Sequence, residues 1–244
     1  MGVNLGMFLI AFRLQSDKLT DISYAVTFMT LALFGFFRSD GEVYHTILFA
    51  IIAVWAVRIG SFLLYRVMKA GKDQRFDGMR ESFFKFIRFW IFQAITVWAL
   101  LLPSLFAFES SGKLSLFVYA GLAIWAVGLV IESIADFQKY RFSQDAKNKG
   151  TWIDVGIWRF SRHPNYFGEI LVWIGVYLIA LVSLTTVQVW IGLVSPVFIT
   201  VLLLFVSGIP LLEKSADKKW GHLKEYQAYK AATSILVPLP KRHR

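Results

Sequence analysis

The sequence predicts an all-α protein: a polytopic transmembrane helical bundle with about six to seven spans and a cytoplasmic C-terminus. Hydrophobic residues make up 57% of the chain, whereas a soluble domain contains about 45–50%. Several uncharged segments approach or exceed the roughly 20 apolar residues that a helix needs to cross a bilayer. Lys and Arg are concentrated in alternate connecting segments, which is typical of the cytoplasmic side of a membrane protein.

The candidate spans follow one another along the whole chain. Residues 1–12 are apolar but too short to cross a bilayer alone, so we expect a tilted or truncated first helix. Four further candidate spans are 22–37, 43–65, 89–108 and 114–131. Segment 170–212 contains no charged residue and is about twice the length of one crossing. Its polar cluster at 183–186 predicts a tight hairpin between two spans.

The distribution of basic residues predicts the orientation of these spans. Segments 13–21, 66–88, 135–166 and 213–244 hold 23 of the 26 Lys and Arg residues. Basic residues stay in the cytoplasm during membrane insertion, so these four segments are predicted to lie there.

The composition excludes several classes of protein. The chain has no cysteine, which rules out disulfides, thiolate zinc sites and iron–sulfur clusters. Its four histidines form no ligand-spaced pair, so we expect no metal site. The net charge of +10 would suggest nucleic acid in a soluble protein, but in a membrane protein it sorts to one face. We expect no nucleic acid and no obligate protein partner.

Charged residues within or beside the spans are the first candidates for a functional site. Arg58 lies inside a span, where a charge costs at least about 2.5–3.5 kcal/mol and needs a partner or a wet cavity. Glu132, Asp136, Glu169 and Glu213 lie at span ends on the predicted cytoplasmic side. One such acid could merely snorkel to water, but the group predicts a site. We predict that Arg58 faces the bundle interior and pairs with Glu169 or Glu132.

The predicted cytoplasmic segments are rich in Arg, Lys, Tyr and Trp. Such a surface suits an anionic ligand with flat rings, because Arg and Lys pair with phosphates and aromatic rings stack on bases. A nucleotide cofactor and a phospholipid head group both fit this description, and membrane lipids are expected partners. The chain has neither G-x-G-x-x-G nor a P-loop motif, so a nucleotide site would be built from helix ends and loops.

Two stretches resemble a known family. They are DVGIWRFSRHPNYFGEIL (residues 154–171) and LLEKSADKKWGHLKEYQAYKAATSILVPLP (211–240). Together they resemble the C-terminal region of the steroid 5-alpha-reductase family, and most closely its compact bacterial branch, DUF1295. The resemblance implies an NADPH-dependent membrane reductase that acts on an activated carbon–carbon double bond in a lipophilic, steroid- or isoprenoid-like substrate. It further implies a bacterial inner-membrane protein with a single integral membrane domain over 1–244. The N-terminal half would face the substrate, and about 130–244 would bind the cofactor.

The resemblance also implies the residues of the cofactor site. The Asn and Glu of the family's N-x-x-G-E segment correspond to Asn165 and Glu169, and the acid after the fifth span corresponds to Asp136. A tyrosine near the end of the family's sequences corresponds to Tyr226, which forms a Tyr-x-x-Tyr pair with Tyr229. The full set predicted to bind the cofactor is Arg75, Asp136, Lys139, Arg141, Arg162, His163, Asn165, Glu213, Tyr226 and Tyr229.

Among these residues, the cations predicted nearest the phosphates are Arg75, Lys139, Arg141, Arg162 and His163, because they flank the motif on the cytoplasmic face. Arg162 is the strongest candidate, since a fork-shaped guanidinium can hold two phosphate oxygens at once.

The predicted catalytic residues are Glu169, Tyr166 and Arg58. Reduction of an activated alkene needs a hydride on one carbon and a proton on the next. Tyr166 and Glu169 are three residues apart, so on a helix they share one face. We expect Glu169 to orient the nicotinamide or to relay the proton through Tyr166, and Arg58 to support the site or contact the polar end of the substrate.

Two alternatives stay open. Isoprenylcysteine methyltransferases also carry R-H-P-x-Y at a helix start and Tyr-x-x-Tyr near the end, and they bind S-adenosylmethionine. A non-catalytic lipid-binding membrane protein would share the basic surface. The chain also departs from the eukaryotic reductases, because residues 21–37 lack their Gln-Glu pair and Trp55 stands where they carry a tyrosine.

Overall fold

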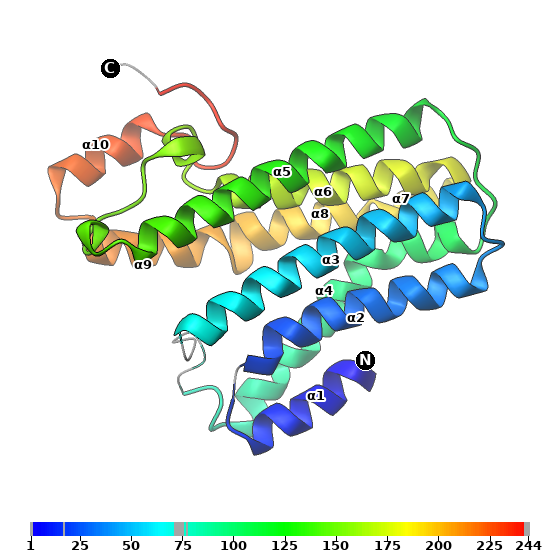
Figure 1. Ribbon diagram of the computed structural model, residues 1–244, viewed down its shortest axis with the longest axis horizontal. Helices are drawn as coiled ribbons and strands as arrows, with labels where there is room; N and C mark the ends of the chain where they lie inside the picture. The colour runs from blue at the N-terminus through cyan, green and yellow to red at the C-terminus, as the bar shows by residue number, and fades with distance from the viewer. Residues whose placement is uncertain (1, 17, 71–75, 77, 242–244) are drawn as a thin grey trace. The chain divides into compact units, whose positions relative to one another are not determined.

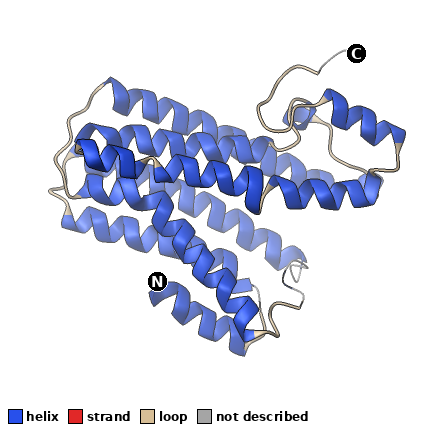
Figure 2. Cartoon of the chain, turned by 180° about the vertical axis from the view of Figure 1, so that it is seen from behind, coloured by secondary structure: helices blue, strands red, loops and turns tan. Residues whose placement is uncertain are grey.

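The computed structural model describes residues 2–16, 18–70, 76 and 78–241. Over these residues the chain consists of helices joined by loops, as the sequence predicts (Figure 2). The helices are α1 (Gly2–Arg13), α2 (Lys18–Arg38), α3 (Val43–Ala70), α4 (Phe83–Phe108), α5 (Leu116–Gln144), α6 (Pro164–Ala180), α7 (Thr186–Gly192), α8 (Val194–Val201), α9 (Ile209–Trp220) and α10 (Lys224–Ala232).

Six helical stretches in the described part of the chain are long and apolar enough to cross a membrane, which indicates an integral membrane protein. They are Leu19–Arg38, Val43–Lys69, Phe83–Phe108, Leu116–Gln144, Pro164–Ser183 and Thr186–Trp220. The prediction of six principal spans is therefore confirmed. Helix α1 has 12 residues and is about 18 Å long, shorter than the roughly 30 Å of hydrocarbon in a bilayer. It matches the expected truncated first helix.

The predicted hairpin is present. A 3₁₀ turn at Leu181–Ser183 is followed by Thr185, which caps α7. The Thr185 side chain accepts a hydrogen bond from the Gln188 amide at 3.4 Å, and Gln188 Oε1 accepts from the Thr185 amide at 3.0 Å. This reciprocal capping box satisfies two amides that would otherwise lack partners. The polar residues at 183–186 therefore end one span and start the next.

The chain divides into two compact units. Unit 1 contains Met1–Ala120 and Val176–Ser195, and unit 2 contains Gly121–Gly175 and Pro196–Arg244. The expectation of a single integral membrane domain stays a prediction.

In unit 1, helices α1 to α4 lie side by side (Figure 1). Their buried surfaces are large and aromatic: Phe8, Phe28, Trp55 and Trp90 are each 1% exposed or less. The rings of Phe28 and Trp55 meet edge to face, 5.0 Å apart. Buried aromatic side chains of this size supply most of the packing contacts of such a bundle.

In unit 2, helices α5 and α6 approach closely through glycines. A Cβ on Gly168 would lie 2.6 Å from the amide nitrogen of Glu132 and from the carbonyl oxygen of Gly128. Two turns further along, a Cβ on Gly175 would lie 2.6 Å from the carbonyl oxygen of Gly121. Small residues let helix backbones come this close in membranes. The contact fixes the first turns of α6, which carry the P-N-Y part of the R-H-P-N-Y motif.

The last span is interrupted before α9. Residues Leu202–Val206 form a π-helical turn, and the Ser207 amide donates to the Leu202 carbonyl at 2.9 Å. Gly208 and Pro210 then start α9. Such π-turns are often found at functional sites, and here the interruption directly precedes the helix that carries Glu213.

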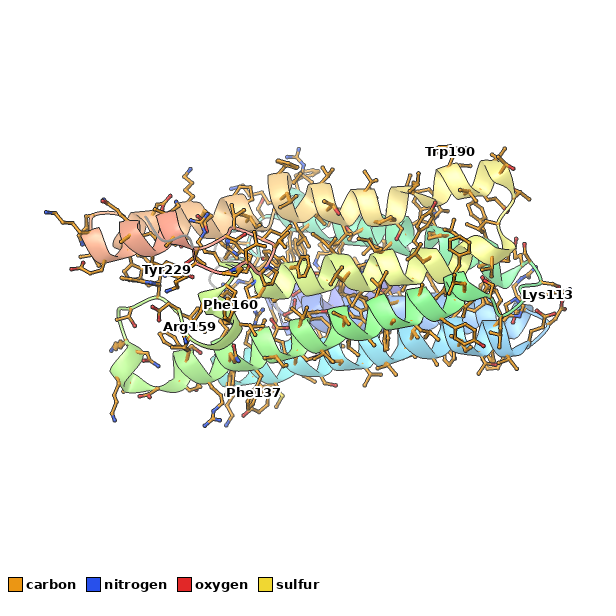
Figure 3. All side chains as sticks on the ribbon, turned by 90° about the horizontal axis from the view of Figure 1, so that it is seen from above. Lys113, Phe137, Arg159, Phe160, Trp190 and Tyr229 are labelled. Carbon is orange, nitrogen blue, oxygen red and sulfur yellow. The ribbon has the colours of Figure 1, made fainter. Side chains whose placement is uncertain are left out.

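Many large apolar side chains are exposed, as expected for helices that face lipid. Trp190 on α7 and Phe137 on α5 are 70% and 58% exposed, and both side chains point away from their helices (Figure 3).

Candidate functional site

The segment that precedes α6 is anchored on α5. The Trp158 indole donates to the carbonyl of Ala135 at 3.1 Å, and the Ile157 amide donates to Gln138 Oε1 at 3.0 Å. Gly156 has a φ of +60°, in the left-handed region that favours glycine, and it starts the short helical turn that contains Trp158. These contacts hold the residues that lead into α6.

The C-terminal segment packs against the same stretch. The Arg162 amide donates to the carbonyl of Ser234 at 2.9 Å, and the Ser161 hydroxyl donates to the carbonyl of Leu236 at 2.6 Å. Ser161 and Ser234 form an isolated parallel bridge. The two segments that resemble the reductase family are thus joined by backbone hydrogen bonds.

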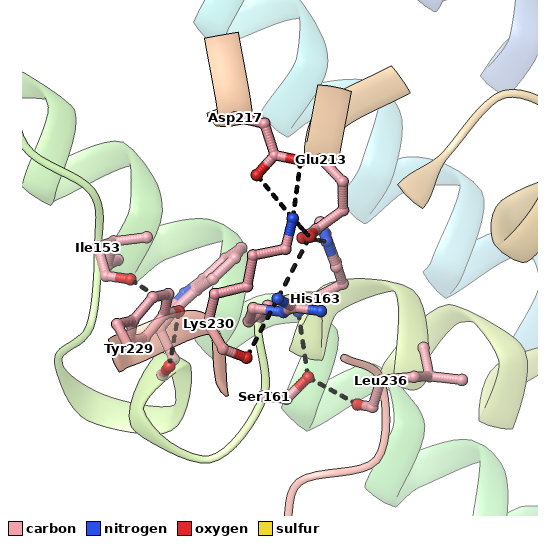
Figure 4. A network of polar contacts seen from close by, with 10 residues as sticks. Ile153, Ser161, His163, Glu213, Asp217, Tyr229, Lys230 and Leu236 are labelled. Carbon is pink, nitrogen blue, oxygen red and sulfur yellow. Dashed lines mark hydrogen bonds and ion pairs between the residues drawn. The ribbon is translucent and has the colours of Figure 1, made fainter. Parts of the chain in front are cut away.

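Glu213 of α9 is the centre of a polar network in unit 2 (Figure 4). Its Oε1 lies 2.8 Å from His163 Nε2, and its Oε2 lies 3.3 Å from Arg162 Nη1 and 3.2 Å from Lys230 Nζ. Lys230 also lies 2.6 Å from Asp217. Hydrogen bonds between charged groups are the strong ones. One carboxylate therefore organises three basic side chains.

His163 is held in one tautomer. Burial lowers its pKa below the ordinary value of 6.5, and the positive charges of Lys139 and Arg162 act in the same direction, whereas the bond to Glu213 opposes it. The neutral ring then donates from Nε2 to Glu213 and keeps a lone pair on Nδ1. Within the described residues, buried Nδ1 has no hydrogen-bond partner. Burial thus disfavours the positively charged form of His163. Its predicted role as a cation near the cofactor phosphates stays a prediction.

The lowered pKa of His163 makes the stability of the protein depend on pH. The pKa of His163 is lower in the folded protein than in the unfolded chain. The neutral ring therefore stabilises the fold above about pH 6.5, and this stabilisation is lost as the pH falls through the pKa of the folded protein. We expect the melting temperature to fall from pH 7.5 to pH 5.5 by more in the wild type than in His163→Gln. Equal falls in both proteins would contradict this prediction.

The structure brings Asn165 and Asp136 together, and their cofactor-binding roles stay predictions. Asn165 Nδ2 donates to Asp136 Oδ1 at 3.3 Å, and Asp136 is buried on α5. Tyr166 is half-buried and stacks on the His163 ring, with centroids 5.7 Å apart and an interplanar angle of 11°. Glu169 is half-buried one turn further along α6. Catalytic roles for Tyr166 and Glu169 stay predictions.

Four aromatic rings gather beside the network. Trp152 lies 5.1 Å from Tyr226 and 6.2 Å from Trp220, and Tyr226 lies 6.2 Å from Tyr229. The Tyr229 hydroxyl donates to the carbonyl of Ile153 at 3.2 Å. Burial raises the pKa of Tyr229, so the phenol stays protonated. Both tyrosines of the Tyr-x-x-Tyr pair therefore belong to the site region.

The remaining predicted cations lie at the surface of this region or elsewhere in the chain. The Lys139 ammonium lies 5.0 Å above the Trp158 ring, and the Arg141 guanidinium lies 5.7 Å from the Phe137 ring. Both basic residues are exposed. Arg75 lies outside the described residues.

Arg58 lies on α3 of unit 1, where it is half-buried and its guanidinium is 5.6 Å from the Phe62 ring. Its predicted partners, Glu132 and Glu169, belong to unit 2. The pairing and the catalytic role of Arg58 stay predictions.

Sequence reasoning missed Lys230, Asp217 and Ser161. Asp217 could have been found, because it lies four residues after Glu213 and therefore shares its helix face. Lys230 resembles every other basic residue of the C-terminal segment until the fold places its ammonium beside both acids.

A family described as proteins of unknown function, DUF1295, matches residues 7–233. The chain belongs to the DUF1295 family. The family match spans α6, the Glu213 network and the Tyr-x-x-Tyr pair. It confirms the resemblance to this branch that the motifs predict.

A similar protein of Schizosaccharomyces pombe (strain 972), described as uncharacterized, is 25% identical over 209 residues. The aligned region covers 71% of this DUF1295 chain and 58% of the yeast protein, so the chain spans less than two thirds of that relative's length. No solved structure matches the chain.

Proposed function

We propose that the chain is a membrane-embedded, NADPH-dependent reductase of an activated carbon–carbon double bond in a lipophilic, steroid- or isoprenoid-like substrate. Membership of the DUF1295 family and the resemblance of its motifs to steroid 5-alpha-reductases support this function. The observation that carries the proposal is the convergence of Arg162, His163 and Lys230 on Glu213 at the start of α6. A cluster of basic donors at a helix end suits a nucleotide site in a protein without a glycine-rich motif.

Arg162 is the cation proposed to hold a phosphate group. Its Nη1 contacts Glu213 and the carbonyl of Lys230, and its side chain is 11% exposed. Glu213 fixes the guanidinium before a ligand arrives, which reduces the entropy lost on binding. Arg162 and Lys230 would therefore hold the phosphates of the cofactor.

The aromatic cluster and the Asn165–Asp136 pair fit the flat parts of a dinucleotide. Trp152 offers a half-buried ring for stacking, and the buried Tyr226 ring packs against it edge to face. Asp136 orients the Asn165 carboxamide that would bond to the nicotinamide amide. The bound cofactor supplies a hydride to one carbon of the double bond.

The neighbouring carbon needs a proton. Tyr166 is a suitable donor, because the His163 ring stacks on it and limits the rotation of the phenol. Glu169, one turn further along α6, would return a proton to Tyr166.

The test is the melting temperature of the purified protein in detergent with NADPH or S-adenosylmethionine. A ligand that binds only the folded state, at 100 times its Kd, adds about 2.7 kcal/mol of stability. For a chain of this size we expect a rise of about 5–10 °C with NADPH. Stabilisation by S-adenosylmethionine alone would indicate a methyltransferase. Stabilisation by neither, with retained anionic lipid, would indicate a lipid-binding protein.

Two matched variants test whether Arg162 binds NADPH. Arg162→Lys keeps the charge but loses the fork, so we expect NADPH to bind about tenfold more weakly, with folding preserved. Arg159→Lys makes the same change at an exposed residue three positions away and should leave the Kd unchanged. Equal affinities in both variants would remove Arg162 from the cofactor site.

A further inference from the structure

The segment that follows α10, red in Figure 1, carries exposed apolar side chains. Ile235, Val237 and Leu239 are 43%, 44% and 46% exposed. Leu236 and Pro238, which lie between them, are half-buried. The segment therefore directs alternate side chains toward the protein and away from it. Exposed apolar residues that gather in one place mark a contact with a protein or a membrane, and the proposed reductase function gives these side chains no role.

A fourth exposed apolar residue lies beside this segment. The Leu239 amide donates to the carbonyl of Phe160 at 3.0 Å, and Phe160 is 43% exposed. The hydrogen bonds from the Ser161 hydroxyl and the Arg162 amide hold the rest of the segment against the same stretch. Four residues together form the C-terminal apolar face: Phe160, Ile235, Val237 and Leu239.

The C-terminal apolar face is expected at the edge of the hydrocarbon layer. Helix α5 begins at Leu116, and the roughly 20 residues that cross the hydrocarbon bring it to Ala135. The Trp158 indole donates to the carbonyl of Ala135 at 3.1 Å, and Phe160 follows Trp158 by two residues. The face is therefore level with the boundary between acyl chains and head groups. Peripheral anchors bury their apolar side chains at this boundary.

The charges beside the face match an anionic lipid surface. Segments 155–162 and 233–241 contain three basic residues, Arg159, Arg162 and Lys241, and no acidic residue. Arg162 has an acidic partner, whereas Arg159 is exposed and Lys241 is half-buried. Basic residues close to an anionic leaflet strengthen membrane binding.

We propose that the C-terminal apolar face inserts into the head-group boundary of the bilayer, with Arg159 and Lys241 against the phosphates of anionic lipids. The bilayer is the occupant because α5 carries lipid anchors at the same depth. Phe137, two residues after Ala135, is 58% exposed, and the Arg141 guanidinium lies 5.7 Å from its ring. Aromatic and basic side chains are enriched where a span leaves the membrane. This contact does not depend on the proposed reductase function.

The test uses single cysteines that carry a nitrobenzoxadiazole fluorophore, because the chain has no cysteine of its own. Val237→Cys places the label on the face. Gln144→Cys is the matched control, since this exposed last residue of α5 lies nine residues beyond Ala135, or about 14 Å. The full-length proteins are placed, without NADPH, in nanodiscs of equal parts phosphatidylcholine and phosphatidylglycerol. Lipid spin-labelled near the top of the acyl chain should quench the Val237→Cys label about twofold and the Gln144→Cys label little.

A second comparison tests the lipid charge. Arg159→Gln with Lys241→Gln should lower the quenching of the Val237→Cys label to its value in pure phosphatidylcholine. Lys113→Gln removes an exposed basic residue before the other end of α5 and should change nothing. Equal quenching in neutral and anionic nanodiscs would overturn the roles of Arg159 and Lys241.

Absence of lipid quenching at the Val237→Cys label would overturn the membrane contact. If that label were also protected from iodide in the water, a protein or a second copy of the chain would cover the face instead. If the Val237 variant fails to fold, the same label on Leu239→Cys decides. Lipid quenching in a protein that does not bind NADPH would support the membrane contact and reject the reductase.

Discussion

Replacing Glu213 with glutamine is expected to destabilise the protein by about 3 kcal/mol, because it removes the anion shared by Arg162, His163 and Lys230. Arg162 is the most affected cation, since its side chain is only 11% exposed and Glu213 is the acid it contacts through Nη1. Lys230 loses less, because it is a third exposed and keeps Asp217. Thermal unfolding in detergent should show a melting temperature lower by about 6–12 °C.

Asp217→Asn is the matched control for the Glu213 variant. Asp217 is 47% exposed and contacts Lys230 at 2.6 Å, so this exposed pair should be worth no more than about 1 kcal/mol. NADPH affinity should fall sharply in Glu213→Gln and little in Asp217→Asn. Equal destabilisation by the two substitutions would mean that Glu213 is an ordinary surface acid.

Replacing Gly168 with valine is expected to destabilise the protein by at least about 3 kcal/mol, the upper part of the range for overpacking. The new Cβ would lie 2.6 Å from backbone atoms of Glu132 and Gly128, and neither backbone atom can rotate away as a side chain would. Helix α6 must then move from α5, which should also separate Asn165 from Asp136. We expect loss of NADPH binding together with a lower melting temperature.

Gly6→Ala tests whether the effect comes from close helix contact or from glycine replacement in general. A Cβ at Gly6 would meet nothing within 4 Å, and this residue is also helical. The substitution should stabilise the protein by about 0.5–1 kcal/mol, because alanine loses less entropy on folding. A wild-type melting temperature for Gly168→Val would show that α5 and α6 tolerate a wider separation.

Hydropathy and turn chemistry determine much of the fold. The apolar segments and the cluster at 183–186 predict the spans and their hairpin, because length and desolvation decide which segments can be helices in lipid. The helix ends were less predictable. Helix α3 continues to Ala70 and α5 to Gln144, beyond the apolar segments 43–65 and 114–131. Long charged side chains allow this, since they can reach water from the last turns of a helix.

The motif at residues 162–169 could be read from the sequence, because its residues are close together and their spacing on a helix is fixed. The residues that pair with the motif could not be predicted from the sequence. Glu213 lies 50 residues after His163, and Lys230 lies 68 residues after Arg162. The contact of Asn4 could not be predicted either. Residues 1–12 predict only a short apolar helix, but Asn4 is hydrogen-bonded to Thr27.

The sequence by itself therefore determined the all-helical class, the six spans and the local motif, because each depends on composition or spacing within a few turns. Only the tertiary structure decided which polar groups meet. The pairing of Glu213 with Arg162, like the hydrogen bond from Leu239 to Phe160, depends on contacts between distant segments. Those contacts are set by side-chain packing, including the glycine contact of α5 and α6, and no local pattern encodes them.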